Sequence, residues 1–212
     1  MNLERVRTLM SGLLESVISK SGALKHGRPV LAAVAGFALT VSAQSQQHYR
    51  VDPGTSEVRF TLGASDHPVE GSFHIAAGEF TLDPQSGAMT GTVSVDASSG
   101  QSGNQSRDKK MTTAQLKAQT YPAVTFAPAR FSGQVKDAGD SSGPVEGTFT
   151  LLGQAHPITV PMSVHMEGDH FSASGSFSVP FVNWGVKDPS FMFIKVDKEV
   201  KIELKLTGTV TR

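Results

Sequence analysis

Histidine and carboxylate side chains are the groups of this 212-residue chain that could perform acid–base or metal chemistry. The chain contains no His-Glu-x-x-His pair and no Walker-type phosphate loop, the two patterns that would give such residues a mechanism. Cysteine is absent, which excludes disulfides, thiol nucleophiles and thiolate metal sites. The sequence therefore predicts a protein that is not an enzyme and has no cofactor or metal. The histidines are His26, His48, His67, His74, His156, His165 and His170.

The densest charge cluster is Arg107-Asp108-Lys109-Lys110. Two interpretations remain open. The cluster is either the solvated end of a short helix, as charge runs on helices usually are, or a cationic rim that binds a phosphate or carboxylate group. Under the second interpretation Arg107 and Lys110 are candidate contacts to the head group of a ligand.

The chain is rich in phenylalanine, with 12 Phe beside 2 Tyr and 1 Trp. On apolar strand faces such rings normally pack into a core, and they have a binding function only where they line a cavity. With this condition, the candidate lining residues are Phe60, Phe73, Val95, Phe126, Phe149, Val164, Phe177 and Trp184.

The elements that position these side chains are strands. Apolar and polar residues alternate with period two over most of the chain, most regularly over 158–166 and 200–206. Turn sequences such as Asp52-Pro53-Gly54 separate the runs at short intervals. This pattern indicates an all-β sandwich or barrel, and alternation alone does not choose between them. The choice matters, because a barrel of about eight strands has room for one small ligand.

One segment breaks the alternation. Residues 104–118 contain good helix formers, with Asn104 or Ser106 as candidate caps and Pro122 preventing continuation. The sequence predicts a single short helix there.

The first 43 residues resemble a secretory signal peptide. A region of net charge +3 up to Arg28 precedes an uncharged apolar run over 29–43 that ends in Val41-Ser42-Ala43. The alternative is a retained membrane anchor, but this run of 15 residues is shorter than the ~20 needed to span a bilayer. We expect cleavage after Ala43, a periplasmic protein over residues 44–212, and no membrane span in the mature chain.

The mature chain would carry 14 basic and 17 acidic residues, a net charge of −3. Nucleic-acid binding requires clustered Lys and Arg, so we do not expect nucleic acid as a partner.

Several short motifs follow one another along residues 44–212. The order is Tyr49-Arg50-Val51-Asp52-Pro53, Val69-Glu70-Gly71-Ser72-Phe73, the helix start at Arg107-Asp108, Tyr121-Pro122-Ala123-Val124-Thr125-Phe126 and the late Trp184-Gly185. This order resembles the YceI-like family of polyisoprenoid-binding proteins, which has a Gly-x-Phe strand and a Tyr-Pro-x-x-x-Phe motif in corresponding places.

This resemblance implies an extended antiparallel eight-stranded lipocalin-like barrel with one short helix. It also implies an apolar tunnel that holds a polyisoprenoid or fatty-acid-like lipid for carriage, storage or sequestration. Two alternatives remain: an enzyme that uses the cavity, with His67, His74 or His165 as acid or base, and a solid-core adhesion or interaction module. A homodimer is compatible with the sequence, because edge strands can pair.

Overall fold

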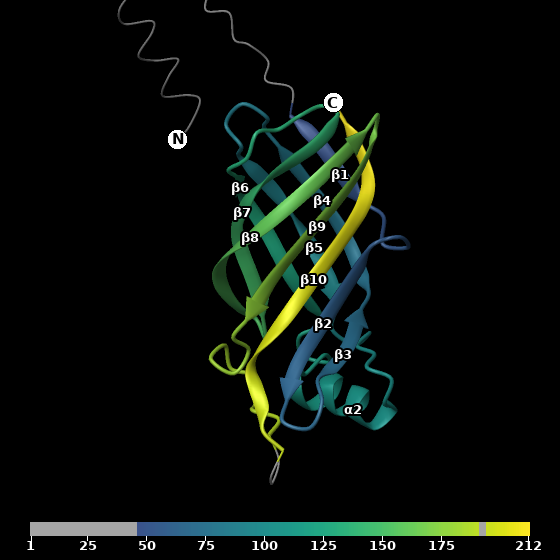
Figure 1. Cartoon of the computed structure of the whole chain (residues 1–212), viewed down its shortest axis with the longest axis vertical. Helices are drawn as coiled ribbons and strands as arrows, with labels where there is room; N and C mark the ends of the chain where they lie inside the picture. Colours follow the sequence, from purple (N-terminus) through teal and green to yellow (C-terminus); the bar gives the residue numbers. More distant parts are fainter. Residues whose placement is uncertain (1–45, 191–193) are drawn as a thin grey trace, which may run out of the picture. The chain divides into compact units, whose positions relative to one another are not determined.

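The computed structural model describes residues 46–190 and 194–212, and these form one β-rich unit with a short helix. Figure 1 shows the strands wound around a common axis, with α2 at one end. The strands of the described part are β1 (Gln47–Val51), β2 (Glu57–Ala64), β3 (Val69–Phe73), β4 (Ile75–Leu82), β5 (Met89–Asp96), β6 (Ala123–Phe131), β7 (Gly139–Leu151), β8 (Gln154–Glu167), β9 (His170–Val179) and β10 (Val196–Thr211).

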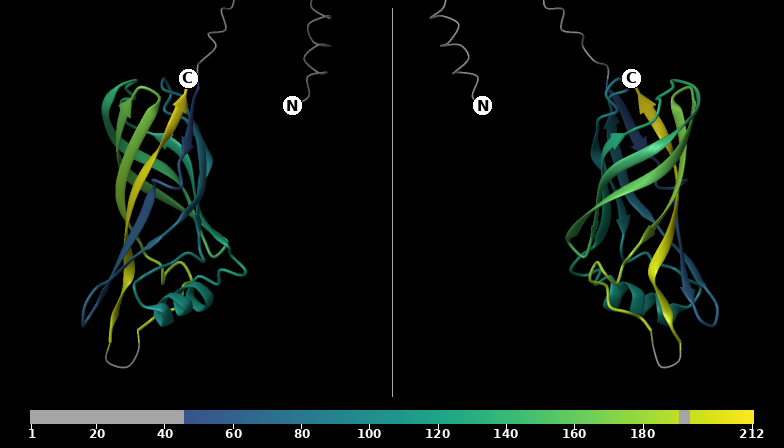
Figure 2. Two further views of the ribbon diagram at one scale, coloured as in Figure 1. Left: turned by 90° about the vertical axis from the view of Figure 1, so that its right-hand side faces the viewer. Right: turned by 60° about the vertical axis from the view of Figure 1, so that its left-hand side comes forward.

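The strands close into an antiparallel barrel. Its order is β1, β4, β5, β6, β7, β8, β9 and β10, and β10 pairs back with β1. In addition, β2 pairs with the first part of β10, and β3 pairs with β2. The closed circuit therefore has eight strands, and the β2–β3 hairpin lengthens the wall toward the helix, as the two views of Figure 2 show. The closure confirms the eight-stranded barrel and rejects the sandwich.

Residue alternation builds this wall. Along β8, the residues at even positions from 156 to 166 are buried or partly buried, whereas the residues between them are exposed. Leu152 and Gly153 connect β7 to β8 with φ values of 51° and 74°, the positive φ that two-residue hairpins favour. The predicted alternation over 158–166 is confirmed, and the residues at even positions face the barrel interior.

The predicted helix is also confirmed, with slightly different bounds. It consists of α2 (Gln105–Lys110) followed by a π-helical turn, η1 (Met111–Gln115). The side chain of Asn104 caps it by accepting a hydrogen bond from the backbone N–H of Arg107 at 3.1 Å. Lys117, with φ of 50°, ends the helical path and starts the turn that leads to β6.

The proposed signal peptide, residues 1–43, lies outside the described residues, so its cleavage after Ala43 stays a prediction. Among the described residues, no helix has the length and apolarity that crossing a bilayer would require.

Candidate functional site

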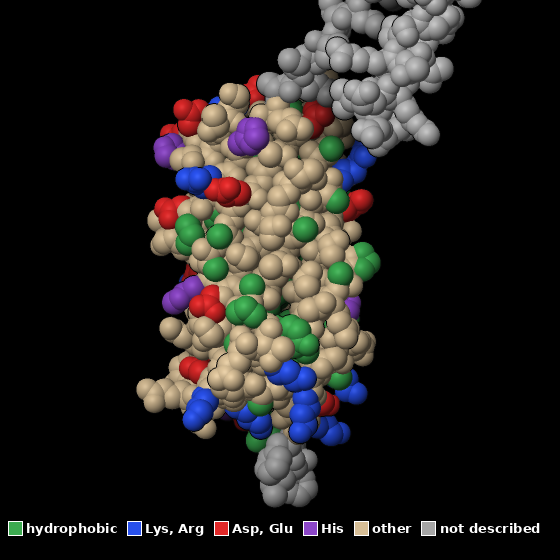
Figure 3. Space-filling model, turned by 180° about the vertical axis from the view of Figure 1, so that it is seen from behind, with side chains coloured by type: hydrophobic (Ala, Val, Ile, Leu, Met, Phe, Trp, Pro, Cys, Tyr) green, Lys and Arg blue, Asp and Glu red, His purple; other side chains and the backbone are tan. Residues whose placement is uncertain are grey.

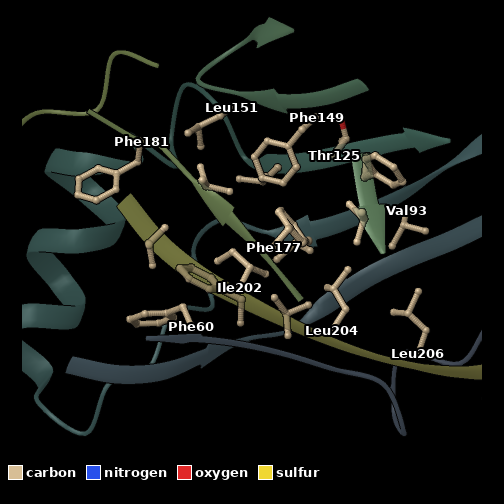
Figure 4. A pocket seen from close by; sticks show the side chains of 18 of the residues that line it. Phe60, Val93, Thr125, Phe149, Leu151, Phe177, Phe181, Ile202, Leu204 and Leu206 are labelled. Atoms are coloured by element: carbon tan, nitrogen blue, oxygen red, sulfur yellow. The ribbon is translucent and has the colours of Figure 1, made fainter. Parts of the chain in front are cut away.

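The barrel interior contains a cavity of about 690 Å³. This volume lies within the ~300–1,000 Å³ that is typical of sites for one small molecule. Inward side chains of the strands line it, and Figure 4 shows Phe149, Phe177 and Leu204 projecting into the space between opposite walls. Apart from Thr125, the polar lining residues lie toward its two ends.

The cavity is long and narrow. Its lining on β7 runs from Ser141 to Leu151. Ten residues of strand span roughly 34 Å, and a strand tilt of about 40° reduces this to roughly 26 Å along the barrel axis. The shape suits an extended chain better than a compact ring system.

The structure brings together most of the site residues nominated from the sequence. Seven of the eight wall candidates line the cavity, and so do both head-group candidates, Arg107 and Lys110. The seven are Phe60, Phe73, Val95, Phe126, Phe149, Val164 and Phe177.

Trp184 is the nominated residue that does not line the cavity. Its ring stacks on His156 with centroids 4.1 Å apart and lies 5.7 Å from the ring of Phe149. The loop after β9 carries Trp184, so strand alternation does not fix its orientation. Trp184 therefore supports Phe149, a residue of the lining, and does not take part in the lining itself.

Glycines keep two of the large rings on the wall. A methyl group at Gly71 would lie 2.5 Å from Cζ of Phe60, and one at Gly147 would lie 2.6 Å from Cζ of Phe126. Both distances are far inside van der Waals contact, so each ring occupies the space that a side chain on the neighbouring strand would need. The rings can therefore lie along the wall instead of filling the barrel interior.

The end of the barrel opposite the helix is tightly packed. Tyr49 stacks on Phe80 at 4.9 Å and meets the edge of Phe171 at 5.3 Å. The Tyr49 hydroxyl donates to Oε1 of the buried Gln47 at 2.7 Å, and Nε2 of Gln47 donates to Asp137 at 3.1 Å. Burial raises the pKa of Tyr49 above its ordinary value of 10.0, with a smaller opposing effect of Arg212. These contacts pack this end of the cavity tightly, and the exposed Lys136 also belongs to its lining there.

At the helix end the cavity reaches the surface, because exposed side chains belong to its lining there, Lys110 and Lys187 among them. Arg107 is partly buried and donates from Nε to the Ser102 hydroxyl and from a terminal nitrogen to the Ser102 carbonyl, both at 2.7 Å. Asp108 accepts from the backbone N–H of Ser102 at 2.8 Å. Arg107 and Asp108 thus fix the loop before the helix, and the mouth of the cavity lies beside it.

One polar atom of the cavity lining at this end has no hydrogen-bond partner among the described residues. Oε1 of Gln115 is buried and accepts no hydrogen bond from the described residues, and Gln115 lines the cavity. A buried carbonyl oxygen without a donor is costly, so it is a ready acceptor for a hydroxyl or amide group of a ligand.

The histidines do not form a catalytic site in the cavity. His67, His74 and His165 are exposed, and none of them lines the cavity. Nδ1 of His165 lies 2.6 Å from Asp140 on the outer surface. The described residues also contain no group of three or more His, Asp or Glu that could hold a metal ion. The alternative in which these histidines act on a molecule in the cavity is therefore not supported.

Residues 139–143 spell Gly-x-Ser-x-Gly, a pattern of nucleophilic hydrolases that sequence reasoning missed. It lies inside β7, whereas the hydrolase motif needs a sharp turn from strand to helix. Ser141 lines the cavity, and the neighbouring Asp140 is exposed and contacts His165 outside. Ser141 and His165 therefore lie on opposite faces of the wall and do not form a catalytic pair.

Several lining residues were not nominated from the sequence. Ile202, Leu204 and Leu206 of β10 are inward residues whose regular alternation was visible in the sequence. Gln115 and Lys187 had no such signal, since the end of a helix and a loop have no period-two pattern that would indicate direction.

Comparison with known proteins gives a family and a fold. The YceI-like domain model matches residues 49–208. No curated protein is similar enough in sequence to count as a match. Among solved structures, BcnA of Burkholderia cenocepacia is 24% identical with a TM-score of 0.62, covering 75% of this chain and 99% of its own.

Two further structures share the barrel. A polyisoprenoid binding domain from Saccharophagus degradans, implicated in plant cell wall breakdown, is 14% identical with a TM-score of 0.61, covering 77% of this chain and 98% of its own. A mutant YceI protein from Campylobacter jejuni is 12% identical with a TM-score of 0.50, covering 93% and 96%. At these identities the likeness establishes the fold alone.

Proposed function

The chain belongs to the YceI-like domain family, and from this premise we propose that it binds one long apolar lipid inside its barrel. The ligand class is a polyisoprenoid or a fatty-acid-like chain. The observation that carries the proposal is the cavity of about 690 Å³, which is elongated, lined mainly by apolar side chains and tightly packed at the Tyr49 end.

The hydrophobic effect sets a minimum chain length. Each buried CH₂ contributes roughly 0.8 kcal/mol. Association costs an estimated 4–15 kcal/mol in lost freedom, so a chain of only a few methylenes gains too little to stay bound. A chain that occupies most of the roughly 26 Å of tunnel buries enough methylenes to offset this cost of association. Length, more than a specific polar contact, should therefore select the ligand.

The polar head of the ligand would lie at the helix end. Arg107 and Lys110 supply positive charge there, and the unpaired Oε1 of Gln115 supplies an acceptor. A head group with acidic oxygens and a hydroxyl or amide donor would satisfy both. The aromatic packing of Tyr49, Phe80 and Phe171 leaves the opposite end to the apolar tip.

As part of this proposal, the protein carries, stores or sequesters the lipid after export to the periplasm. The signal-like sequence over residues 1–43 supports export, and the apolar lining of the cavity supports binding.

Native mass spectrometry of the protein as its own host produces it, without detergent, tests the proposal. We expect an added mass of a prenyl or acyl lipid in a 1:1 complex, and a protein mass that shows whether residues 1–43 are removed. The same spectrum gives the oligomeric state. Protein that is repeatedly empty, and that also takes up no prenyl or fatty ligand, would reject the proposal.

A series of linear alcohols of increasing length sharpens the test. Affinity should rise about fourfold for each added methylene, the ratio that corresponds to 0.8 kcal/mol, until the tunnel is full. The intrinsic fluorescence of Trp184, the one tryptophan of the chain, can follow binding because its ring contacts Phe149 of the lining. An affinity that does not depend on length would argue against a tunnel site.

A further inference from the structure

The helix end of the barrel carries a group of basic side chains around the cavity mouth. Figure 3 shows Lys and Arg gathered at this end of the molecule. Residues 104–118, the helix with its flanking turns, hold four basic residues and one acidic residue. The group, called the basic rim below, consists of Arg107, Lys109, Lys110, Lys117, Lys187 and Lys195.

The basic rim combines a high density of basic side chains with a lack of ion pairs among the described residues. Elsewhere Arg50 pairs with Glu79 at 2.8 Å, and Lys201 pairs with Glu203 at 2.6 Å. In the described part of the chain, no rim residue forms an ion pair with a carboxylate. The nearby Asp108 is engaged with Ser102. The positive charge of the rim is therefore available to a partner outside the molecule.

An apolar side chain accompanies these charges. Ile194 is 46% exposed and is the large hydrophobic residue that the described surface leaves most open to water. It precedes β10 at the helix end and is followed directly by Lys195 of the basic rim. Cations together with an exposed apolar side chain are the combination that favours the interfacial region of an anionic bilayer.

The charge of the remaining molecule would orient the contact. Residues 44–212 carry a net charge of −3, and residues 104–118 contribute +3 to it. The rest of this part of the chain is therefore net negative, with Asp188 and Asp197 close to rim residues in the sequence, and an anionic surface would attract the rim more strongly than the remaining surface. Such a field would orient the molecule so that the cavity mouth faces the membrane on approach.

We propose that the basic rim docks the cavity mouth on the anionic surface of a lipid bilayer, and that the cargo passes between bilayer and cavity there. This proposal rests on the proposed function, because it needs a lipid in the tunnel. A mouth held against the membrane would let an apolar chain move from one apolar environment to the other with little exposure to water.

Co-sedimentation with lipid vesicles tests the docking. The full protein should bind vesicles made of equal parts phosphatidylcholine and phosphatidylglycerol, and should bind pure phosphatidylcholine weakly. Raising the ionic strength should release it, because salt screens such attraction. Equal binding to both vesicle types would overturn the proposal.

Two double variants assign the binding to the rim. Lys109→Gln with Lys117→Gln removes two charges that do not line the cavity, and should lower partitioning about 30-fold, the effect of two lysines near an anionic surface. Arg130→Gln with Lys205→Gln removes the same charge from β6 and β10 and should leave partitioning nearly unchanged. All forms carry the same residues 1–45, so these cannot cause a difference. Equal loss in both double variants would reject the rim as the docking surface.

Native mass spectrometry of the same variants separates this proposal from the proposed function. Protein with bound lipid that ignores anionic vesicles would overturn docking and leave lipid binding intact. Protein that binds anionic vesicles through the rim but never contains lipid would support docking and reject the carrier function. Binding of soluble glycerol phosphate at the rim without any vesicle binding would assign the rim to a head group instead, and would also overturn docking.

Discussion

The Tyr49 end of the barrel and the region from its middle to the helix, called the packed end and the hollow end below, are made from the same alternating strands but are packed differently. At the Tyr49 end the inward residues are nearly inaccessible, with Met166 at 3% and Phe171 at 4% exposure. Along the middle and toward the helix, Phe177, Ile202 and Leu204 line the same cavity but stay partly exposed. A smaller buried cluster of Leu151, Val179, Phe181 and Val186 packs against this region. The alternation of apolar and polar residues is the same in both regions, whereas the density of side-chain packing differs.

This difference gives the two regions separate roles in stability and in ligand binding. The packed end supplies stabilisation through close contacts among aromatic rings and aliphatic side chains. The hollow end gives up such contacts and leaves apolar surface that a ligand can cover. Substitutions at the two ends should therefore have opposite signatures, with stability affected at the packed end and ligand binding at the hollow end.

The largest effect is expected from removing a ring at the packed end. Phe171→Ala should lower the free energy of unfolding by about 3–5 kcal/mol, because the buried ring packs against Tyr49 and Phe80 and its loss removes these contacts. Phe177→Ala is the matched change at the hollow end and should cost only roughly 1–2 kcal/mol, since its side chain is only partly buried. Urea denaturation followed by Trp184 fluorescence measures both.

In ligand binding the order should reverse, with Phe177→Ala losing more affinity than Phe171→Ala. If the two variants lose equal free energies of unfolding, the two ends are packed alike and the proposed difference between them is wrong.

Enlarging a side chain gives the second contrast. Val145 and Val95 both line the cavity, but Val145 is 8% exposed within the packed cluster and Val95 is partly exposed. Val145→Phe should destabilise the protein by about 1–3 kcal/mol through overpacking. Val95→Phe should be tolerated within about 1 kcal/mol and should reduce lipid uptake by occupying the tunnel. Thermal unfolding and lipid uptake, measured on both variants, decide the matter; a strongly destabilised V95F would show that the tunnel has no spare room.

The smallest effect concerns a single hydroxyl at the packed end. Tyr49→Phe should cost about 1–2 kcal/mol near neutral pH, because Oε1 of the buried Gln47 loses its donor at 2.7 Å. Burial raises the pKa of Tyr49 above 10.0, so the neutral phenol favours the folded state. This contribution is complete below pH 10.0 and is lost as the pH rises toward the folded value, because the unfolded tyrosine ionises first.

The stability of the parent protein should therefore fall more steeply above pH 10.0 than that of the Tyr49→Phe variant. Urea titrations at a series of alkaline pH values check the slope, and parallel slopes would contradict the buried, protonated phenol.

The helix could be predicted because its signals are local. Asn104 caps it as a candidate cap should, and the break in alternation over 104–118 located it within a few residues. Because these signals are local, the sequence left two positions open for Lys110, at a solvated helix end or at the barrel mouth. A charged residue at a helix end can lie in solvent or beside a cavity. Its position depends on the strands that pack next to the helix.

The candidate site was predictable where strands carry it and not elsewhere. Phe60, Phe126 and Phe177 obey alternation, so their inward direction follows from the sequence once the wall is known. Trp184 lies on a loop without such a rule, and its stacking on His156 depends on a segment 28 positions earlier in the chain. Gln115 entered the lining because the helix crosses one end of the barrel, which its own residues do not specify.

The sequence alone determined the strands, the apolar face of each and the short helix, because these follow from period, propensity and capping within a few residues of each position. Only the tertiary structure decided that the sheet closes on itself through β1 and β10, that one end is packed and the other hollow, and that the unpaired lysines surround the opening. Closure of the barrel and packing of its interior depend on contacts between strands that are distant in the sequence. The residues around each position do not indicate such contacts.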